Sequence, residues 1–500
     1  MTRVLIAAAL VILTTVAGAK TLRVGGTQTP STLGNPYSSV GPPGSTTWSA
    51  MFDGLTGLDV SNKLVPALAV SWRPSGPRTW EFKLRPGVKF QDGSDFAADD
   101  VVAVIEALKT PDGQRFIAAT ELRVVESIRA IDPLTVEFTT IEPDAILPKR
   151  LNIIMIVEPN AWKRLGPEGF GLKPVGTGPF ILKDWGRASG RVVMEAFKGS
   201  WRAPKEVDRL EIAMIGDTAA RTQAMMADQI DIAVALNPED AKVLEGPGIR
   251  IQWTPTPVVM SIAFRTERTD AAPLKDKRVR QALNYAVDKQ GIVDGILNGT
   301  TRPSSQGVTP ETFGYNPELK AYPYDPAKAK ALLAEAGYPQ GFKLASEVLT
   351  NLGMSDTSIY QKVAEDVSKV GVKLELRSST FANWLRYYSS GDWGDIDAFS
   401  LTWNAAPFGD AIRPIEYFSC IKAAPFFCDQ SVVPLIKASS REMDESKRAA
   451  LLRQVMAVYH DLAPALWLVD FTNMVVVSDR VDNVINRPIG IEFENVTFKK

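Results

Sequence analysis

Strand-like segments alternate with helical segments along most of this chain, and this alternation restricts its fold more than any other feature. One complete example starts with the mostly apolar run 210–215, continues through the helical segment 218–227 and ends with a second strand-like run at 231–236. A strand, a helix and a further strand in this order are typical of a β-α-β unit. The sequence therefore predicts an α/β protein.

Other segments repeat the two patterns. Apolar residues at helical spacing predict helices, and alternating or continuous short apolar runs predict strands. The expected helices are 99–108, 279–287, 326–337, 359–370 and 441–459. The expected strands are 21–25, 80–90 with a turn at Pro86-Gly87, 134–138, 180–182, 372–376 and 464–468.

Length and charge limit the possible classes of protein. A single hydrophobic core rarely grows beyond about 250–300 residues, so 500 residues predict two or three lobes. The charged fraction of 23% is ordinary for a globular protein, and the net charge is −1. Without basic runs, the chain is a poor candidate for binding nucleic acid.

The first 19 residues differ from the rest. Arg3 precedes the almost wholly apolar run 4–16, and Ala17-Gly18-Ala19 follows as a small-residue cleavage site. This order predicts a secretory signal peptide, residues 1–19, cleaved after Ala19. The alternative is an uncleaved membrane anchor, although the apolar run is short for a membrane span.

Cysteine and histidine are both scarce. Cys420 and Cys428 are the two cysteines, and in an oxidising compartment we expect them to form a disulfide. His460 is the one histidine and lies where a helix is expected to end, so we interpret it as structural. A single histidine excludes an HExxH zinc site, and neither a G-x-S-x-G turn nor a Gly-Lys phosphate loop is present. The sequence thus predicts no enzyme, no metal and no cofactor.

Aromatic residues gather in one stretch of 26 residues, mixed with Gly, Asp and Pro. Trp393, Trp403, Phe408, Tyr417 and Phe418 all lie within it. Aromatic side chains beside polar turn residues suit a concave site that encloses a small ligand. Ordinary core packing is the alternative, above all for Trp393 and Phe418. The polar loop 27–45 after the first strand is a second candidate for ligand contacts.

Five segments in order resemble the family-5 extracellular solute-binding proteins, which serve ABC importers of peptides, nickel chelates, opines and some sugars. The strongest is LRPGVKFQDGSDFAADDV at 84–101. The others are MFDGLTGLDVSNKLVPALAVSW at 51–72, PVGTGPF at 174–180, DKRVRQALNYAVDK at 276–289 and YDPAKAKALLAEAGYP at 324–339. Together they cover nearly all of the chain after residue 19.

The resemblance implies a periplasmic-binding-protein-like α/β fold, type II and cluster C-like, with two lobes joined by a two-strand hinge and an extra inserted domain. Lobe I would comprise 20–54, 175–263 and 474–500, the inserted domain II 55–174, and lobe III 264–473. The hinge strands would pass near Phe264 and Asn473. Closure of the lobes would enclose the solute.

The same resemblance places the ligand contacts. Relatives that bind dipeptides hold the amino group with an aspartate three residues after a tryptophan, and here Ala406 follows Trp403 at that spacing. Their arginine for the carboxylate aligns with Thr350. Asp410 or Arg413 could supply a displaced charge. The candidate ligand-binding residues are Trp403, Asn404, Ala405, Ala406, Thr27, Gln28, Thr29, Gly353, Met354, Phe408 and Asp410.

We therefore expect a monomeric, periplasmic solute-binding protein that delivers a small molecule to the membrane permease of an ABC importer. Because a dipeptide's two charges would lack partners, we expect no tight binding of free dipeptides. Two alternatives are a secreted hydrolase with an unrecognised site and a periplasmic chaperone or sensory receptor with the same fold.

Overall fold

A computed structural model describes residues 18–39, 41, 44–268, 272–350, 353–487 and 490–499. Apart from Gly18 and Ala19, the expected signal peptide lies outside the described residues. Within those ranges, no helix combines the length and apolarity needed to cross a bilayer.

Eleven strands in the described part of the chain form one mixed sheet. Its order is β14-β13-β15-β12-β17-β11-β1-β10-β9-β8, and β16 pairs with β12 outside this path. The bounds are β1 Thr21–Gly26, β8 Phe180–Asp184, β9 Arg191–Ala196, β10 Arg209–Met214, β11 Ile232–Val234, β12 Ile249–Phe264, β13 Phe342–Val348, β14 Val372–Ser378, β15 Ala398–Ser400, β16 Trp403–Asn404 and β17 Ala465–Ser478.

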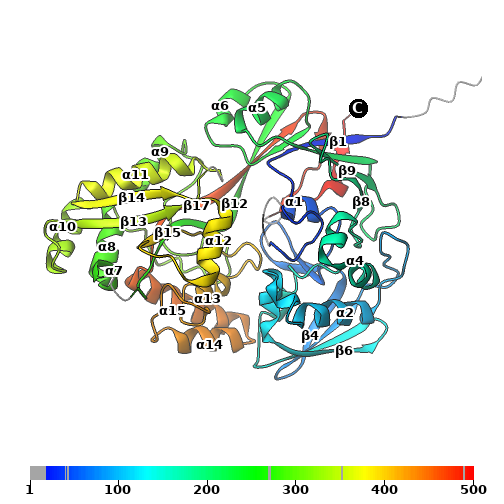
Figure 1. Ribbon diagram of the computed structural model, residues 1–500, viewed down its shortest axis with the longest axis horizontal. Coiled ribbons are helices and arrows are strands. Elements are labelled where there is room, and N and C mark those ends of the chain that lie inside the picture. Colours follow the sequence, from blue (N-terminus) through cyan, green and yellow to red (C-terminus); the bar gives the residue numbers. More distant parts are fainter. Residues whose placement is uncertain are drawn as a thin grey trace, which may run out of the picture.

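Strands β12 and β17 are the long central pair of this sheet, and they connect its two ends (Figure 1). They run antiparallel from Ile249 opposite Ser478 to Ala263 opposite Ala465. The register shifts twice, between Pro255 and Val259 and between Val259 and Ser261. Such shifts bend and twist a strand pair. The bend therefore lies upstream of Phe264, which is paired with β15 inside the second end of the sheet.

One end of the sheet, with β1 and β8–β11, forms what we call lobe I. The expected β-α-β unit is confirmed as β10, α5 (Thr218–Met226) and β11, and α6 (Asp240–Leu244) follows it. Both strands lie parallel to β1, one on each side, so β1 is inserted between them. Figure 1 shows α5 and α6 together at the top of the molecule, beside the crossing of β12 and β17.

The other end, with β13–β15, carries most of the helices and forms lobe III. Their bounds are α7 Ala272–Lys275, α8 Lys277–Ala286, α9 Lys289–Gly295, α10 Pro326–Glu335, α11 Asp356–Ser368, α12 Phe381–Ser390, α13 Ile412–Tyr417, α14 Val433–Arg441 and α15 Glu445–Leu462. The helices expected in this part of the chain are confirmed as α8, α10, α11 and α15. Aspartate side chains cap four helix starts by accepting backbone N–H groups. These are Asp276, Asp288, Asp325 and Asp444.

A separate four-stranded antiparallel sheet, β4-β5-β7-β6, marks the inserted domain. Its elements are β4 Ala69–Gly76, β5 Thr79–Leu84, α2 Ala98–Lys109, β6 Val125–Asp132, β7 Thr135–Thr140, α3 Leu147–Arg150 and α4 Pro159–Leu172. The expected strand at 80–90 ends at Leu84, because the turn at Gly87 leads only to an isolated bridge between Lys89 and Asp95. In Figure 1 this domain lies below lobe I and faces α13 and α14. The exact boundaries of the three parts stay predictions.

One buried lysine sits in the core of lobe III. Lys289 is 3% exposed, and its Nζ donates to the main-chain oxygen of Asn284 at 3.1 Å and lies 5.4 Å from the centre of the Tyr322 ring. Burial lowers the pKa of Lys289 to about 7. The folded protein therefore releases this proton more readily than the unfolded chain, in which lysine keeps a pKa near 10.4.

We expect Lys289→Met to stabilise the protein at neutral pH. Below about pH 7 both states of the wild type hold the proton and the folded state bears the full cost of a buried charge. Between pH 7 and about 10 this cost disappears. The gain in free energy of unfolding should be roughly 2–4 kcal/mol at pH 7 and should shrink towards pH 10. Urea unfolding at several pH values measures it. Lys330→Met, an exposed change on α10, is the control, and an equal gain for Lys289→Met at every pH would contradict the shifted pKa.

Candidate functional site

The segment 403–406 lies where the chain crosses between the two lobes. Trp403 and Asn404 form β16, which pairs with Val259 and Val258 of β12 at the register shifts. Ala405 N–H then donates to Pro257 O at 2.9 Å. Backbone pairing thus fixes this segment to the bend in the central strands.

The ring of Trp403 is covered by protein on all sides in this structure. It has no exposed surface and stacks on Phe418 with 4.0 Å between ring centres, while Tyr459 and Trp467 contact its edges. A Cβ at Gly307 would approach the indole to 2.0 Å, so this position requires glycine. The Nε1 atom of Trp403 is buried without a hydrogen-bond partner. Trp403 therefore supports the segment from behind, and its predicted stacking against a solute stays a prediction.

The next three residues carry no ionic side chain. Asn404 turns its Oδ1 back to accept the N–H of Ala406 at 2.9 Å, and its main-chain oxygen accepts Arg413 Nη1 at 2.6 Å. Ala405 is fully buried and Ala406 nearly so. At the place where dipeptide-binding relatives are expected to carry aspartate, the chain thus presents a methyl group.

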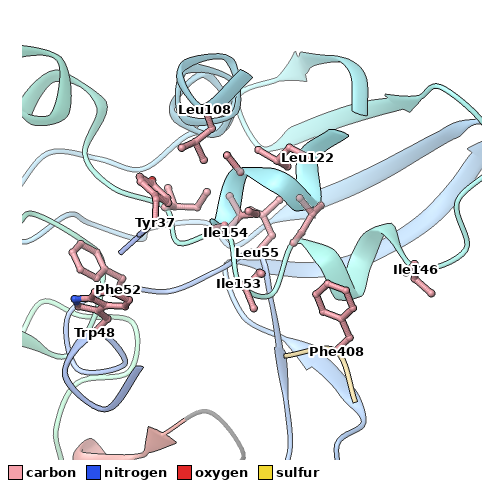
Figure 2. Packing of buried hydrophobic residues seen from close by; sticks show 14 of the residues in the cluster. Tyr37, Trp48, Phe52, Leu55, Leu108, Leu122, Ile146, Ile153, Ile154 and Phe408 are labelled. Carbon is pink, nitrogen blue, oxygen red and sulfur yellow. The ribbon is translucent and has the colours of Figure 1, made fainter. Parts of the chain in front are cut away.

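Phe408 reaches from lobe III into the inserted domain. Figure 2 shows its ring in one view with Ile153 and Ile146, which belong to the same hydrophobic cluster, and the guanidinium carbon of Arg150 lies 5.7 Å from the ring centre. The neighbouring main-chain oxygen, of Pro407, accepts Asn152 Nδ2 at 2.8 Å. Phe408 is fully buried by these contacts. Its role as a ligand contact stays a prediction, whereas its packing joins two parts of the molecule.

The carboxylate of Asp410 is already satisfied by protein groups. Arg448 donates to both of its oxygens, at 2.7 and 2.8 Å, and Lys149 of the inserted domain donates at 2.7 Å. Burial alone would raise the pKa of Asp410, but Arg448 and Lys149 outweigh burial and hold this pKa far below its usual range. The backbone N–H of Ile412 also donates to Oδ1, at 3.1 Å, so the four lone pairs of the carboxylate are all used and none is left for a solute amine. Asp410 thus joins lobe III to the inserted domain.

A second ion cluster lies across the same boundary. Arg150 is 4% exposed and donates to Glu121 at 2.7 Å and Asp144 at 3.0 Å, both in the inserted domain, and to Glu416 of α13 at 2.8 Å. Burial raises the pKa of Glu416, although Arg150 acts in the opposite direction. Nothing in the sequence singled out Lys149 or Arg150, because their partners in lobe III lie more than 250 positions away.

The other expected contacts lie on loops at the ends of strands. Thr27 and Thr29 are half-buried and Gln28 is exposed, directly after β1. Gly353 and Met354 both have positive φ, +117° and +53°, in the turn before α11. Met354 is buried, and its Sδ accepts Thr472 N–H at 3.3 Å.

The loop before α11 also reaches lobe I. Ser355, the next residue, donates from Oγ to Glu239 of lobe I at 2.6 Å. Thr350, where relatives would carry arginine, has its hydroxyl 3.2 Å from Ser378 Oγ. Neither Ser355 nor Thr350 provides a cation for a solute carboxylate.

The two cysteines form the expected disulfide, Cys420–Cys428. The loop that it closes contains Phe426, which lies edge-on to both Phe418 and Phe399. His460 stacks on Tyr322 at 4.7 Å, and its Nε2 lies 3.0 Å from Lys320 O, so the histidine contacts lobe III itself. In the ranges described, no three His, Cys, Asp or Glu side chains converge as metal ligands.

We expect Asp410→Ala to destabilise the protein strongly, because it leaves Arg448 and Lys149 buried without their anion. The loss in free energy of unfolding should be about 3–5 kcal/mol at pH 7. Because the pKa of Asp410 is depressed, its contribution is present above about pH 4 and disappears as the pH falls below that value. Chemical denaturation at pH 7 and pH 3 measures both effects. Asp112→Asn, an exposed carboxylate on the inserted domain, should change little, and a similarly small effect at Asp410 would show that the ion pairs are weak.

Comparison with known proteins identifies the family. Residues 63–423 match the bacterial extracellular solute-binding proteins, family 5. The dipeptide-binding protein of Escherichia coli K12 is 27% identical, and the match covers 88% of this chain and 87% of that protein. The glutathione-binding protein GsiB of Pectobacterium atrosepticum is 30% identical, and the match covers 68% of this chain and 66% of that protein. The structure of AgaA of Agrobacterium strain R10 with agropinic acid has a TM-score of 0.83 and 24% identity over 96% of this chain and 99% of its own, which shows the same periplasmic-binding-protein fold with an extra domain. The chain belongs to the family-5 bacterial extracellular solute-binding proteins.

Proposed function

We propose that this protein captures a small solute between lobes I and III and delivers it to the membrane permease of an ABC importer. The family is one of binding proteins for small solutes and not of enzymes. The observation that carries the proposal is the position of the 403–406 segment, which is attached to the bend of the two strands that connect the lobes. A solute held there contacts lobe III beside the point about which lobe I turns.

The hinge in this proposal consists of the irregular part of the central strand pair. On β12 it comprises the stretch from Thr254 to Ser261, and on β17 the stretch opposite, from Trp467 to Asn473. Register shifts leave some ladder hydrogen bonds unformed, which makes this part of the pair easier to bend than its two regular ends. The protein acts as a monomer, because both lobes that grip the solute come from one chain.

The solute differs from a free dipeptide. Ala406 and Thr350 occupy the positions at which dipeptide-binding relatives are expected to place an acid and a base. A zwitterion enclosed there would leave both of its charges without a counter-charge, which costs several kcal/mol by order of magnitude. The class of solute therefore has to be sought among molecules with another distribution of charge.

We expect one class of small solute to raise the melting temperature of refolded, ligand-free protein, and free dipeptides to bind more weakly than about 10 μM. A ligand at 100 times its dissociation constant adds about 2.7 kcal/mol to the stability, which is easily measured. The panel comprises dipeptides, longer peptides, glutathione, opines, oligosaccharides and metal chelates. A dipeptide that binds below 10 μM would show that the charge anchors lie elsewhere. A silent panel would overturn the import proposal, and turnover of a peptide or glycoside would favour a hydrolase.

The proposed location is the periplasm, after removal of residues 1–19. We expect the exported protein to begin at Lys20, because the apolar run 4–16 and the sequence Ala17-Gly18-Ala19 match a cleaved leader. Intact-mass measurement of the protein from a periplasmic extract tests this directly. Ala19→Arg, which removes the small residue at the cleavage site, should leave the uncleaved chain on the membrane, and an unchanged mature mass for this variant would place the cleavage at another site.

A further inference from the structure

Three cations without an acidic partner gather where the Trp403 segment meets the inserted domain. They are Arg413 of α13, Lys422 of the disulfide loop and Arg123 of the inserted domain. Within the ranges that the structure describes, none of the three has a carboxylate oxygen within the 4.0 Å of an ion pair. Most cations elsewhere in the interface, such as Lys149 and Arg150, are paired.

Arg413 is the most deeply buried of the three. Only 6% of its surface is exposed, and among the described residues its one hydrogen bond runs from Nη1 to Asn404 O. Its Nε is buried without any partner. The guanidinium carbon lies 5.0 Å from the centre of the Tyr417 ring and 5.7 Å from that of Phe408. A buried guanidinium with one neutral acceptor is costly, since several of its N–H donors remain unused.

Lys422 lies beside the ring of Tyr388, whereas Arg123 is exposed and its Nε donates to Thr120 O at 2.8 Å. Lys422 Nζ donates to three main-chain oxygens at 2.9–3.2 Å and lies 4.5 Å from the centre of the Tyr388 ring. Burial, with a smaller contribution from Arg123, lowers the pKa of Lys422 to about 8. Tyr388 also interacts electrostatically with both Arg123 and Arg413. Lys422 thus lies against Tyr388 and Arg413 against Tyr417.

The acids nearest to this group are already bound. Glu121 accepts Arg150 at 2.7 Å and the hydroxyl of Tyr417 at 3.2 Å, and Glu416 accepts Arg150 at 2.8 Å. Neither carboxylate approaches Arg413 within ion-pair distance in the described structure. Arg413 thus has no ion-pair partner among the described residues.

We propose that Arg413 binds an anionic oxygen group of the solute, a carboxylate or a phosphate. The inference rests on the proposed import function and names its solute class. The planar guanidinium suits such a group because two parallel N–H bonds match two oxygens. Asn404 O holds Arg413 against the 403–406 segment, so the anion lies next to the segment that the family resemblance assigns to ligand contact.

The test compares acids with their neutral counterparts on two proteins. Refolded wild type and Arg413→Met are titrated calorimetrically with glutathione, agropinic acid and glucose 6-phosphate, and with the carboxyl esters of the first two and free glucose. For an acid that binds the wild type, Arg413→Met should weaken the affinity about 10- to 100-fold, and the neutral counterpart should bind both proteins equally weakly. Arg413→Lys should keep part of the affinity. If the carboxylic acids lose affinity in Arg413→Met, the site binds a carboxylate; if glucose 6-phosphate loses affinity, the site binds a phosphate.

Controls separate this inference from the function on which it rests. Arg453→Met removes an exposed cation of α15 and should leave the affinity unchanged. Arg413→Gln replaces Arg413→Met if the latter fails to fold. A solute that binds the wild type and Arg413→Met equally would overturn the anion site and keep the import function. A set of acids and neutral compounds that all fail to bind the wild type would overturn both.

Discussion

The pairing of β12 with β17 is the constraint on which the rest of the structure depends. These strands carry the sheet from lobe I to lobe III, so the positions of both lobes follow from one antiparallel ladder. The ladder is regular at its two ends and shifted in register between Pro255 and Ser261. The regular ends hold each lobe firmly, while the irregular middle gives a bend between them. Strand β16 pairs with β12 at this bend, so its position depends on both lobes.

The second constraint is electrostatic and acts between the inserted domain and lobe III. Arg150 and Lys149 of the inserted domain are buried against Glu416 and Asp410 of lobe III. Removing such charges from water is favourable only when each finds its partner at short range, so these pairs favour one relative position of the two parts over any intermediate one. Phe408, buried between the same parts, adds an apolar contact that is lost when they separate. The backbone ladder thus contains the bend between the lobes, and the buried ion pairs hold the inserted domain against lobe III.

The sequence predicted the local elements well and the long-range ones poorly, for a physical reason. Helix α10 begins after the Asp325 cap, and β10-α5-β11 follows its apolar pattern, because both depend on neighbours within a few positions. The apolar pattern did not predict strand β12, which the family resemblance implied only as a hinge strand near Phe264, and β17 extends far beyond 464–468. Both strands are buried by partners distant in sequence, so periodicity alone could not give their length. Similarly, the resemblance located the 403–406 segment, while the partners of Asp410 could be found only in three dimensions.

Asp410 and Arg413, which lie three positions apart, show why a sequence motif alone does not identify the solute. Asp410 and Arg413 were equivalent candidates in the sequence, since either could replace the missing dipeptide anchors. In the structure, Asp410 is surrounded by two cations, so its charge serves the contact between domains. Arg413 has only a neutral oxygen as partner. Since a protein gains no stability from a buried cation without a counter-charge, its presence is best explained by an anion that arrives with the solute. The selectivity of the site then depends on which charges the protein leaves unpaired.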